Sequence, residues 1–178
     1  MLIAITGSPK SGKTTLANMI KEKAKKLKEK VLVLHINEWI RKNCKESIVS
    51  YDKKVKAFII DTNIVEKHLK TYIKEAKKKY EYIIIESHLL PEINITFDIA
   101  FILDVKPLIL YKRMKEATYS NEKIEENLIA VHLDYFFKKI KAKKKIRFKP
   151  LFSEEDVKKI EKIIIKCGKK NVKSVLSE

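Results

Sequence analysis

MLIAITGSPKSGKTT, residues 1–15, is the stretch that decides the fold of this chain. It begins with an apolar run, residues 2–5, of the length of a buried strand. Residues 7–14 then fit the phosphate-loop pattern G-x-x-x-x-G-K-S/T, and a helical pattern follows directly. Two of the chain's three glycines stand in this loop, which argues against an accidental Gly-Lys-Thr turn. Strand, loop and helix together predict a site for a nucleoside triphosphate.

The residues of the loop have separate expected tasks. In a phosphate loop the backbone N–H groups converge on the phosphates, toward which the following helix directs its positive end. We expect the Lys13 ammonium to lie against the β- and γ-phosphates, the Thr14 hydroxyl on Mg²⁺ and Thr15 at the α-phosphate. Lys10 is an additional cation that either contacts a phosphate or points to water. The predicted ATP-binding residues are Gly7, Lys10, Gly12, Lys13, Thr14 and Thr15.

The composition is typical of one globular domain that spans residues 1–178. Hydrophobic residues make up 45% of the chain and charged residues 35%, and the length suffices for a core of its own. The longest apolar runs, such as residues 82–85 and 99–103, are far too short to cross a bilayer. The first apolar run lacks the basic lead of a signal peptide. We therefore expect no membrane partner and a cytoplasmic location.

The charge balance is strongly basic. The formal net charge is +17, and lysine carries nearly all of the positive charge. This charge either forms a solvated lysine surface or attracts RNA and other polyanions. Residues 138–149, KKIKAKKKIRFK, hold eight basic residues and no acid, so they are either a solvated helix end or a contact for phosphate backbones.

The cysteines and histidines show no metal-binding pattern. Cys44 and Cys167 are far apart in the chain, without a Cys-x-x-Cys or Cys/His cluster. The sequence therefore predicts neither a structural zinc site nor a disulfide. The four histidines are also scattered, and we expect most of them to have no ligand role.

Apolar runs alternate with helical patterns along the chain. Strands are expected at residues 2–5, 31–36, 80–86 and 98–103, with a fifth, edge strand at 146–148. One helix separates the first two strands, which makes them parallel. Residues 37–61 have weaker periodicity and are interpreted as a small insertion, not as a sheet element. The sequence therefore predicts a three-layer α/β fold with a five-stranded, mainly parallel sheet.

Boundary signals mark several helices. Asp61 predicts the N-cap of a helix, and Pro107 suits the first turn of another. Ser153 with Asp156 predicts the start of the last helix, and Gly168 predicts its end. Three helices have expected inner faces: Leu16, Ile20, Ala24 and Leu27 in the helix after the loop; Val65, Leu69, Tyr72, Ile73 and Ala76 in the helix after Asp61; and Val157, Ile160, Ile164 and Cys167 in the last helix.

A nucleotide site of this type also needs an acid at the end of a neighbouring buried strand. Glu86 ends the apolar run Tyr82–Glu86 and is expected to hold a Mg²⁺-bound water or to orient an attacking group. His88 follows two residues later, where its imidazole either reaches a phosphate or water, or has a purely structural role.

These motifs together resemble those of a known family. Besides the phosphate loop, the chain contains Ile36-Asn37, Tyr51-Asp52-Lys53-Lys54 with Ile59-Ile60-Asp61, Ile85-Glu86-Ser87-His88, and Leu110-Tyr111-Lys112-Arg113-Met114 followed by Tyr119 and residues 123–127. In this order and spacing they resemble the small adenylate kinase-like proteins of archaea and eukaryotes that act in small-subunit ribosome maturation. The similarity runs from the loop to about Phe137.

The resemblance implies a P-loop nucleoside monophosphate (NMP) kinase-like fold, with an NMP-binding insertion at 37–61 and a short lid at 116–126. It implies phosphoryl transfer from ATP, with Mg²⁺, to AMP or another nucleoside monophosphate, and ATPase activity. It adds Arg113 to Lys13, Glu86 and His88 as catalytic residues, and Asn37 as a substrate-binding residue. Thr14 and Glu86 are the expected metal ligands. A small-subunit ribosomal protein and pre-ribosomal RNA are the implied partners.

The chain departs from the family pattern at three places. Ala117-Thr118 stand where the family usually has Arg-Gly, Asp104 where it has an arginine, and Glu86 where it has an aspartate. Lysine does not replace the rigid fork of arginine, and one such arginine contributes about 10³–10⁵ in rate in related reactions. We therefore expect nucleotide binding to be kept better than fast phosphoryl transfer.

Three functions fit the same loop. The first is an adenylate kinase-type enzyme (ATP + AMP to 2 ADP) that assists small-subunit maturation and rRNA processing. The second is a nucleotide-gated assembly factor with weak chemistry, which the missing arginines favour. The third is a polynucleotide 5′-kinase, which the basic tract at 138–149 favours.

Overall fold

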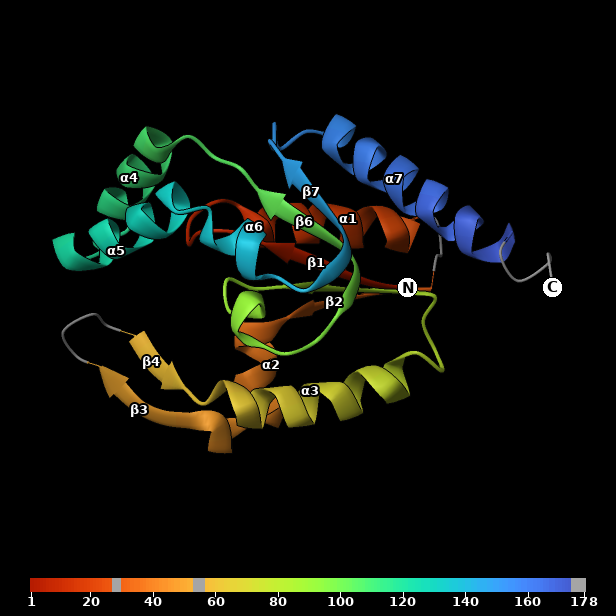
Figure 1. Ribbon diagram of the computed structural model, residues 1–178, viewed down its shortest axis with the longest axis horizontal. Helices are drawn as coiled ribbons and strands as arrows, with labels where there is room; N and C mark the ends of the chain where they lie inside the picture. The colour runs from red at the N-terminus through yellow and green to blue at the C-terminus, as the bar shows by residue number, and fades with distance from the viewer. Residues whose placement is uncertain (27–29, 53–56, 174–178) are drawn as a thin grey trace.

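The computed structural model describes residues 1–26, 30–52 and 57–173 (Figure 1). Its strands are β1 (Leu2–Thr6), β2 (Val31–His35), β3 (Ile48–Asp52), β4 (Ala57–Ile60), β5 (Tyr82–Glu86), β6 (Phe97–Leu103) and β7 (Ala142–Phe148). Its α-helices are α1 (Lys13–Lys26), α2 (Ile36–Asn43), α3 (Thr62–Ala76), α4 (Pro107–Glu116), α5 (Asn121–His132), α6 (Tyr135–Lys139) and α7 (Glu154–Lys173), and two 3₁₀ turns are η1 (Lys45–Ser47) and η2 (Leu90–Glu92).

Within the described residues, five strands form one sheet in the order β2-β5-β1-β6-β7. Every neighbouring pair in it is parallel, so the predicted five-stranded sheet is confirmed and the edge strand β7 is parallel too. The carboxyl ends of parallel strands meet at one edge, where Glu86 of β5 pairs with Ile5 of β1 and with His35 of β2. This edge is therefore the place where the site must be assembled.

The sheet is buried between two layers of helices. Successive residues of a strand face opposite sides, so Ile3 and Ile5 of β1 pack with α1 and α7, whereas Leu2 and Ala4 pack with α2, α3 and α6. The inner faces expected for α1 and α3 are confirmed at the described side chains, apart from Tyr72, which is only partly buried. Leu27 and Cys167 lie outside the residues whose side chains are described.

The predicted caps agree with the structure at α3 and disagree at α7. The Asp61 carboxylate accepts from the N–H groups of Asn63 and Ile64, as expected of an N-cap. Asp156 instead accepts from the N–H groups of Leu151 and Phe152, at 2.7 and 2.6 Å, and so closes the loop before the helix. The expected end at Gly168 is wrong, because α7 continues to Lys173. A glycine costs a helix only about 1 kcal/mol, which does not oblige it to stop.

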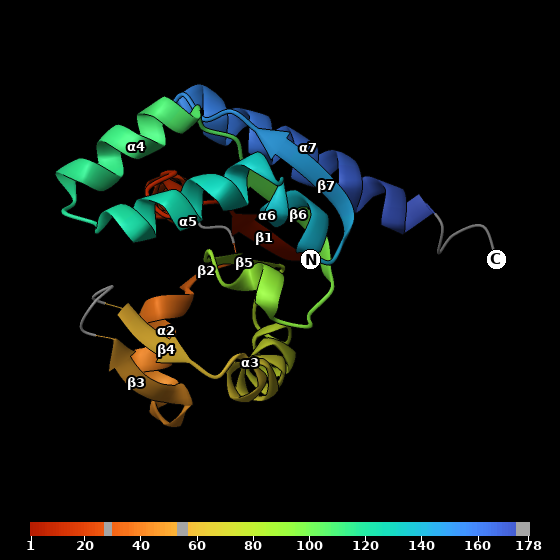
Figure 2. The ribbon, with the colours of Figure 1, turned by 60° about the vertical axis from the view of Figure 1, so that its left-hand side comes forward.

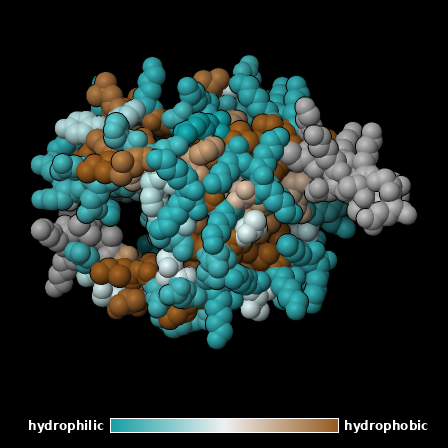
Figure 3. All heavy atoms as spheres, in the orientation of Figure 1, coloured by the Kyte–Doolittle hydropathy of each residue, from teal (hydrophilic) through white to brown (hydrophobic). Residues whose placement is uncertain are grey.

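The segment between β2 and α3 contains more regular structure than the sequence predicts. It holds α2, η1 and the antiparallel pair β3–β4, so the prediction that it has no sheet element is wrong. Its strands are short and bear exposed apolar side chains, which hides the alternation of a half-buried strand; these side chains are Val49, Tyr51, Phe58 and Ile59. Figure 3 shows apolar surface at the lower left, where β3 and β4 lie in Figure 1.

The crossover from β6 to β7 runs through α4, α5 and α6. Helices α4 and α5 pack on each other through a small separate cluster that contains Leu110, Met114 and Ile124. Figure 2 shows this pair on one side of the molecule and α2 with the β3–β4 hairpin on another, both away from the middle of the sheet. None of the described helices has the length and apolar character that a bilayer-spanning segment needs.

Candidate functional site

The loop between β1 and α1 has the backbone geometry that its two glycines permit. Gly7 has φ of +141° and Gly12 has φ of +91°, values that residues with a side chain rarely adopt. A Cβ at Gly7 would lie 3.0 Å from the carbonyl oxygen of Leu103, at the end of β6. The loop therefore lies directly against the carboxyl edge of the sheet.

Lys13 is the first residue of α1, and its side chain turns back under the loop. The residue is 7% exposed, and its ammonium donates to the carbonyl oxygen of Ser8 at 2.8 Å. Burial lowers the pKa of Lys13 to about 8, while the charge of Glu86 opposes part of this shift. At neutral pH Lys13 is thus a buried cation whose hydrogen-bond partner is a neutral carbonyl.

Two serine hydroxyls in the loop lack hydrogen-bond partners. Among the described residues, the side-chain oxygens of Ser8 and Ser11 are buried and make no hydrogen bond. Buried polar groups are normally paired, so orphaned donors beside a buried cation indicate an absent anion. The residues present therefore fit the phosphates of a nucleotide.

Glu86 lies where the sequence predicts the acid, and the structure brings it to the loop. Its Oε1 accepts a hydrogen bond from the Thr14 hydroxyl at 3.1 Å. The same oxygen lies 3.0 Å from Nδ1 of His35. Carboxylate and hydroxyl oxygens are hard ligands of the kind that Mg²⁺ prefers, so Thr14 and Glu86 fit the metal that accompanies a nucleoside triphosphate.

His35 is a site residue that the sequence reasoning missed. It ends β2 and is the register partner of Glu86, and its ring is largely buried. The signal was available: β2 ends in a polar residue, and parallel neighbours end at one edge. His35 and Thr14 thus contact the same oxygen of Glu86 and together fix the orientation of its carboxylate.

His88 follows the end of β5 by two residues and lies close enough to Lys13 to interact with its charge. Burial lowers the pKa of His88 to about 4, and the charges of Lys13 and Lys123 add to the shift. The imidazole is therefore neutral at pH 7. A neutral ring can donate one hydrogen bond to a phosphate oxygen or water, whereas an imidazolium beside Lys13 would be unstable.

Arg113 reaches the phosphate loop from α4. One of its guanidinium nitrogens donates to the carbonyl oxygen of Lys10 at 3.2 Å. Lys10 itself is exposed, and its ammonium lies 5.6 Å from the centre of the Tyr119 ring. The segment that bears Arg113 and Tyr119 is thereby tied to the loop from outside.

Phe152 is the second residue that the sequence did not reveal, because nothing marks the loop after β7 as part of a site. Its ring packs on Gly12, where a Cβ would lie 2.3 Å from two ring carbons. The guanidinium of Arg113 lies 5.5 Å from the centre of the same ring. A surface hollow opens here, lined by Lys10, Gly12, Lys13, Thr14, Thr15, Arg113 and Phe152.

Asn37, the predicted substrate-binding residue, follows the end of β2 by two positions. It is exposed in the first turn of α2, directly after β2. It therefore lies near the edge of the sheet at which His35 and Glu86 end their strands.

These features define a P-loop nucleotide-binding protein of the parallel α/β class. A family model described as an AAA domain matches residues 3–131, which is more than half of the chain. A protein named "Putative adenylate kinase" in Methanosarcina barkeri is 37% identical over 134 residues, which cover 75% of this chain and 67% of that protein. The chain belongs to this adenylate kinase-like P-loop family.

Other archaeal relatives bear the same name. The protein of Methanosarcina acetivorans is 33% identical over 136 residues, covering 75% of this chain and 68% of its own length. The protein of Methanosarcina mazei is 31% identical over 189 residues, and this match covers 96% of this chain and 91% of the relative. The similarity thus extends beyond the phosphate loop to nearly the whole chain in one relative.

Proposed function

We propose that this protein is a nucleoside monophosphate kinase of the adenylate kinase type, converting ATP and AMP to two ADP, with ATPase activity. The observation that carries the proposal is the contact of Thr14 with Glu86 beside the buried Lys13. These groups come from α1 and β5, and the arrangement supplies one cation and a pair of hard oxygen ligands at one edge of the sheet. ATP with Mg²⁺ supplies the phosphoryl group and the neutralising charge.

The residues of the chain have distinct tasks in such a transfer. Lys13 neutralises charge on the phosphates, and the loop N–H groups with the hydroxyls of Ser8 and Ser11 position them. Glu86, whose carboxylate is positioned by His35, would hold the metal ion together with Thr14. Neutral His88 donates to a phosphate oxygen or to a water, and hydrolysis results where water replaces the monophosphate as acceptor.

Arg113 is the arginine available to stabilise the charge of the moving phosphoryl. In the structure its guanidinium contacts Lys10 and Phe152, at the rim of the hollow. Ala117 and Asp104, which stand in place of family arginines, offer no such group. The proposed rate of transfer is accordingly modest, and AMP is the first acceptor to test.

Two segments complete the proposed enzyme. Residues 37–61, which include α2 and the β3–β4 hairpin, are the proposed NMP-binding insertion, with Asn37 at its start. Residues 116–126 are the proposed lid, which comprises the end of α4, the turn after it and the first half of α5. The strands β3 and β4 of the first segment and the helices α4 and α5 at the second lie toward the left of Figure 1, which supports a monophosphate bound between them.

A role in small-subunit ribosome maturation, with a ribosomal protein and pre-ribosomal RNA as partners, rests on the family resemblance. The basic tract at 138–149 supports it less than its composition suggests. Three of its eight basic side chains are paired with acids of the protein: Lys139 with Glu92, Lys143 with Asp98 and Arg147 with Asp134. The tract is largely the paired edge strand β7, which also weakens the case for a polynucleotide kinase.

The proposal is tested by measuring ADP formation from ATP, AMP and Mg²⁺. Lys13→Ala and Glu86→Gln should each lower the rate by about 10²-fold or more, because each removes a charge that acts on the phosphates or the metal. Lys21→Ala is the matched control, since Lys21 is exposed on the same helix. If ADP formation and ATP hydrolysis both persist in Lys13→Ala, the enzymatic proposal fails.

A screen of nucleoside monophosphates as acceptors, with and without the ribosomal partner, separates the alternatives. Transfer to one monophosphate supports the kinase. Tight ATP binding with near-background turnover, stimulated by the partner, would support the gated assembly factor instead.

A further inference from the structure

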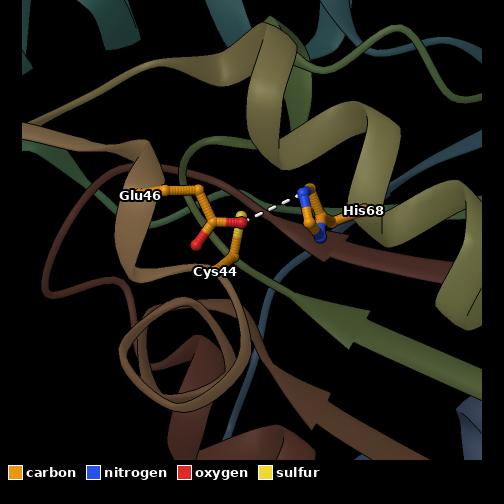
Figure 4. Close-up of side chains that lie close together, drawn as sticks. All are labelled: Cys44, Glu46 and His68. Atoms are coloured by element: carbon orange, nitrogen blue, oxygen red, sulfur yellow. Dashed lines mark ion pairs between the residues drawn. The ribbon is translucent and has the colours of Figure 1, made fainter.

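Three side chains of metal-binding type come together away from the nucleotide site (Figure 4). They are Cys44, directly after α2, Glu46 in η1 and His68 in α3. One ligand atom of each, the thiol sulfur, a carboxylate oxygen and a ring nitrogen, lies within 4.8 Å of the others. Figure 4 shows the three side chains converging from these separate elements on one point.

The backbone holds these residues in place without a metal. The N–H of Cys44 donates to the carbonyl oxygen of Ile40 at 2.9 Å and ends α2. The Ser47 hydroxyl donates to the carbonyl oxygen of Cys44 at 2.7 Å. The N–H of Asp61 donates to the carbonyl oxygen of Ser47 at 2.8 Å. Since Asp61 also caps α3, the helix that bears His68 is joined to the turn that bears Glu46. The ligand set is therefore preorganised.

Burial and charge differ across the cluster. Cys44 is fully buried in the main core, whereas the side chains of His68 and Glu46 are 44% and 52% exposed. The Nε2 atom of His68 lies 3.0 Å from Oε1 of Glu46, which suits two ligands of one ion as well as a simple ion pair. An ion pair at the surface contributes only about 0–1 kcal/mol to the stability of a protein, and it does not require a thiol beside it. The buried sulfur beside the pair is what distinguishes this cluster.

We propose that Cys44, Glu46 and His68 bind one Zn²⁺ ion, with a water molecule at the fourth position on the exposed side. Thiolate, imidazole and carboxylate together are a zinc donor set, and three protein ligands with one open position are a common arrangement. Mg²⁺ and Ca²⁺ take oxygen ligands and are excluded by the sulfur. The site is thus chemically distinct from the oxygen pair formed by Thr14 and Glu86.

Binding requires a thiolate. A cysteine thiol ordinarily has a pKa of about 8.5, so the metal-free protein keeps this proton at neutral pH. When zinc binds, the sulfur–metal bond forms, the S–H bond breaks and the proton passes to the buffer. The ion then links η1 to α3, and so fixes the segment before the β3–β4 hairpin to the helix after it.

The test uses the full-length protein, stripped of metal by a chelator and titrated with Zn²⁺, and with Co²⁺ as a spectroscopic probe. We expect one zinc per chain, a thiolate-to-cobalt charge-transfer band, and one proton released per ion. At zinc about 100-fold above its Kd, the Tm should rise by roughly 5–10 °C. Mg²⁺ should not compete.

Variants separate this site from chance binding elsewhere. Cys44→Ser should abolish the cobalt band, whereas Cys167→Ser, the other cysteine, should leave it unchanged. His68→Gln and Glu46→Gln, at exposed side chains that the fold tolerates, should each weaken zinc binding at least about tenfold. His132→Gln, at an exposed histidine of α5, should not.

The same binding measurements can overturn the zinc proposal. The proposal is overturned if the metal-free protein binds no zinc at micromolar concentration, or if His68→Gln and Glu46→Gln bind it as tightly as the wild type. A cobalt band that disappears in Cys167→Ser and persists in Cys44→Ser would assign the binding to the other thiol and equally overturn it.

Discussion

At the level of single residues, burial decides the charge of His88 and makes it a source of acid sensitivity. Its pKa in the folded protein is about 4, below the ordinary value near 6.5, because of burial and the charges of Lys13 and Lys123. Between these values the unfolded chain binds a proton that the folded protein does not. Stability from this group is therefore full above pH 6.5 and is lost as the pH falls toward 4.

This predicts that the free energy of unfolding falls by about 2–3 kcal/mol between pH 7 and pH 4.5 through His88 alone. Denaturant titrations at the two pH values measure the loss. His88→Gln should remove that part of the pH dependence, while His132→Gln, at an exposed histidine, should keep it. An equal loss in wild type and His88→Gln would contradict the assignment.

Gly12 gives a second prediction at this scale. A side chain there meets both a backbone with φ of +91° and the ring of Phe152 at 2.3 Å. Gly12→Ala should cost about 1–3 kcal/mol for the backbone and a similar amount for the overlap. Phe152→Ala should remove the overlap, so the double variant should be more stable than the sum of the single changes by about 1–3 kcal/mol.

Gly7→Ala is the matched control for this cycle. Its Cβ would meet the backbone of Leu103, which the Phe152 change does not relieve. Urea unfolding of the four variants of each cycle gives the coupling energies. Additive effects at Gly12, or equal coupling at Gly7 and Gly12, would show that Phe152 does not pack on the loop as described.

At the level of elements, the hydrophobic periodicity of the sequence predicts the strands and helices whose apolar residues recur at a regular spacing. The strands of the sheet and the cap at Asp61 are confirmed because each depends on a local pattern. The β3–β4 hairpin was not predicted, because its apolar side chains are exposed and do not alternate against a core. The start of α7 directly after Ser153 agrees with the sequence, but the Asp156 carboxylate bonds to the loop that carries Phe152 instead of capping the helix. Such a choice depends on tertiary contacts and leaves no local signal.

At the level of the whole molecule, the topology explains which parts of the site could be predicted. Lys13, Thr14 and Glu86 meet because their motifs end at one edge of a parallel sheet, a consequence that the sequence alone allows. Phe152, by contrast, reaches the loop only after the chain has crossed the entire sheet to its edge strand. Cys44, Glu46 and His68 likewise meet only through the packing of η1 on α3. Residues that meet only through long-range packing cannot be predicted from their spacing in the sequence.

The nucleotide site is built from elements that are far apart in the chain, and this predicts how a bound nucleotide changes the stability of the fold. The site draws on β1, β2, β5, α4 and the loop before α7, so a bound nucleotide connects elements from both ends of the chain. MgATP at about 100-fold above its Kd should stabilise the fold by about 2.7 kcal/mol, which corresponds to roughly 5–10 °C in Tm for a chain of this size. Thermal unfolding with and without MgATP measures this stabilisation.

Removal of Mg²⁺ by a chelator should reduce the shift in Tm, because Thr14 and Glu86 then lose the ion that joins them to the phosphates. Lys13→Ala should lose most of the shift and Lys21→Ala should keep it; an undiminished shift in Lys13→Ala would mean that the nucleotide binds elsewhere.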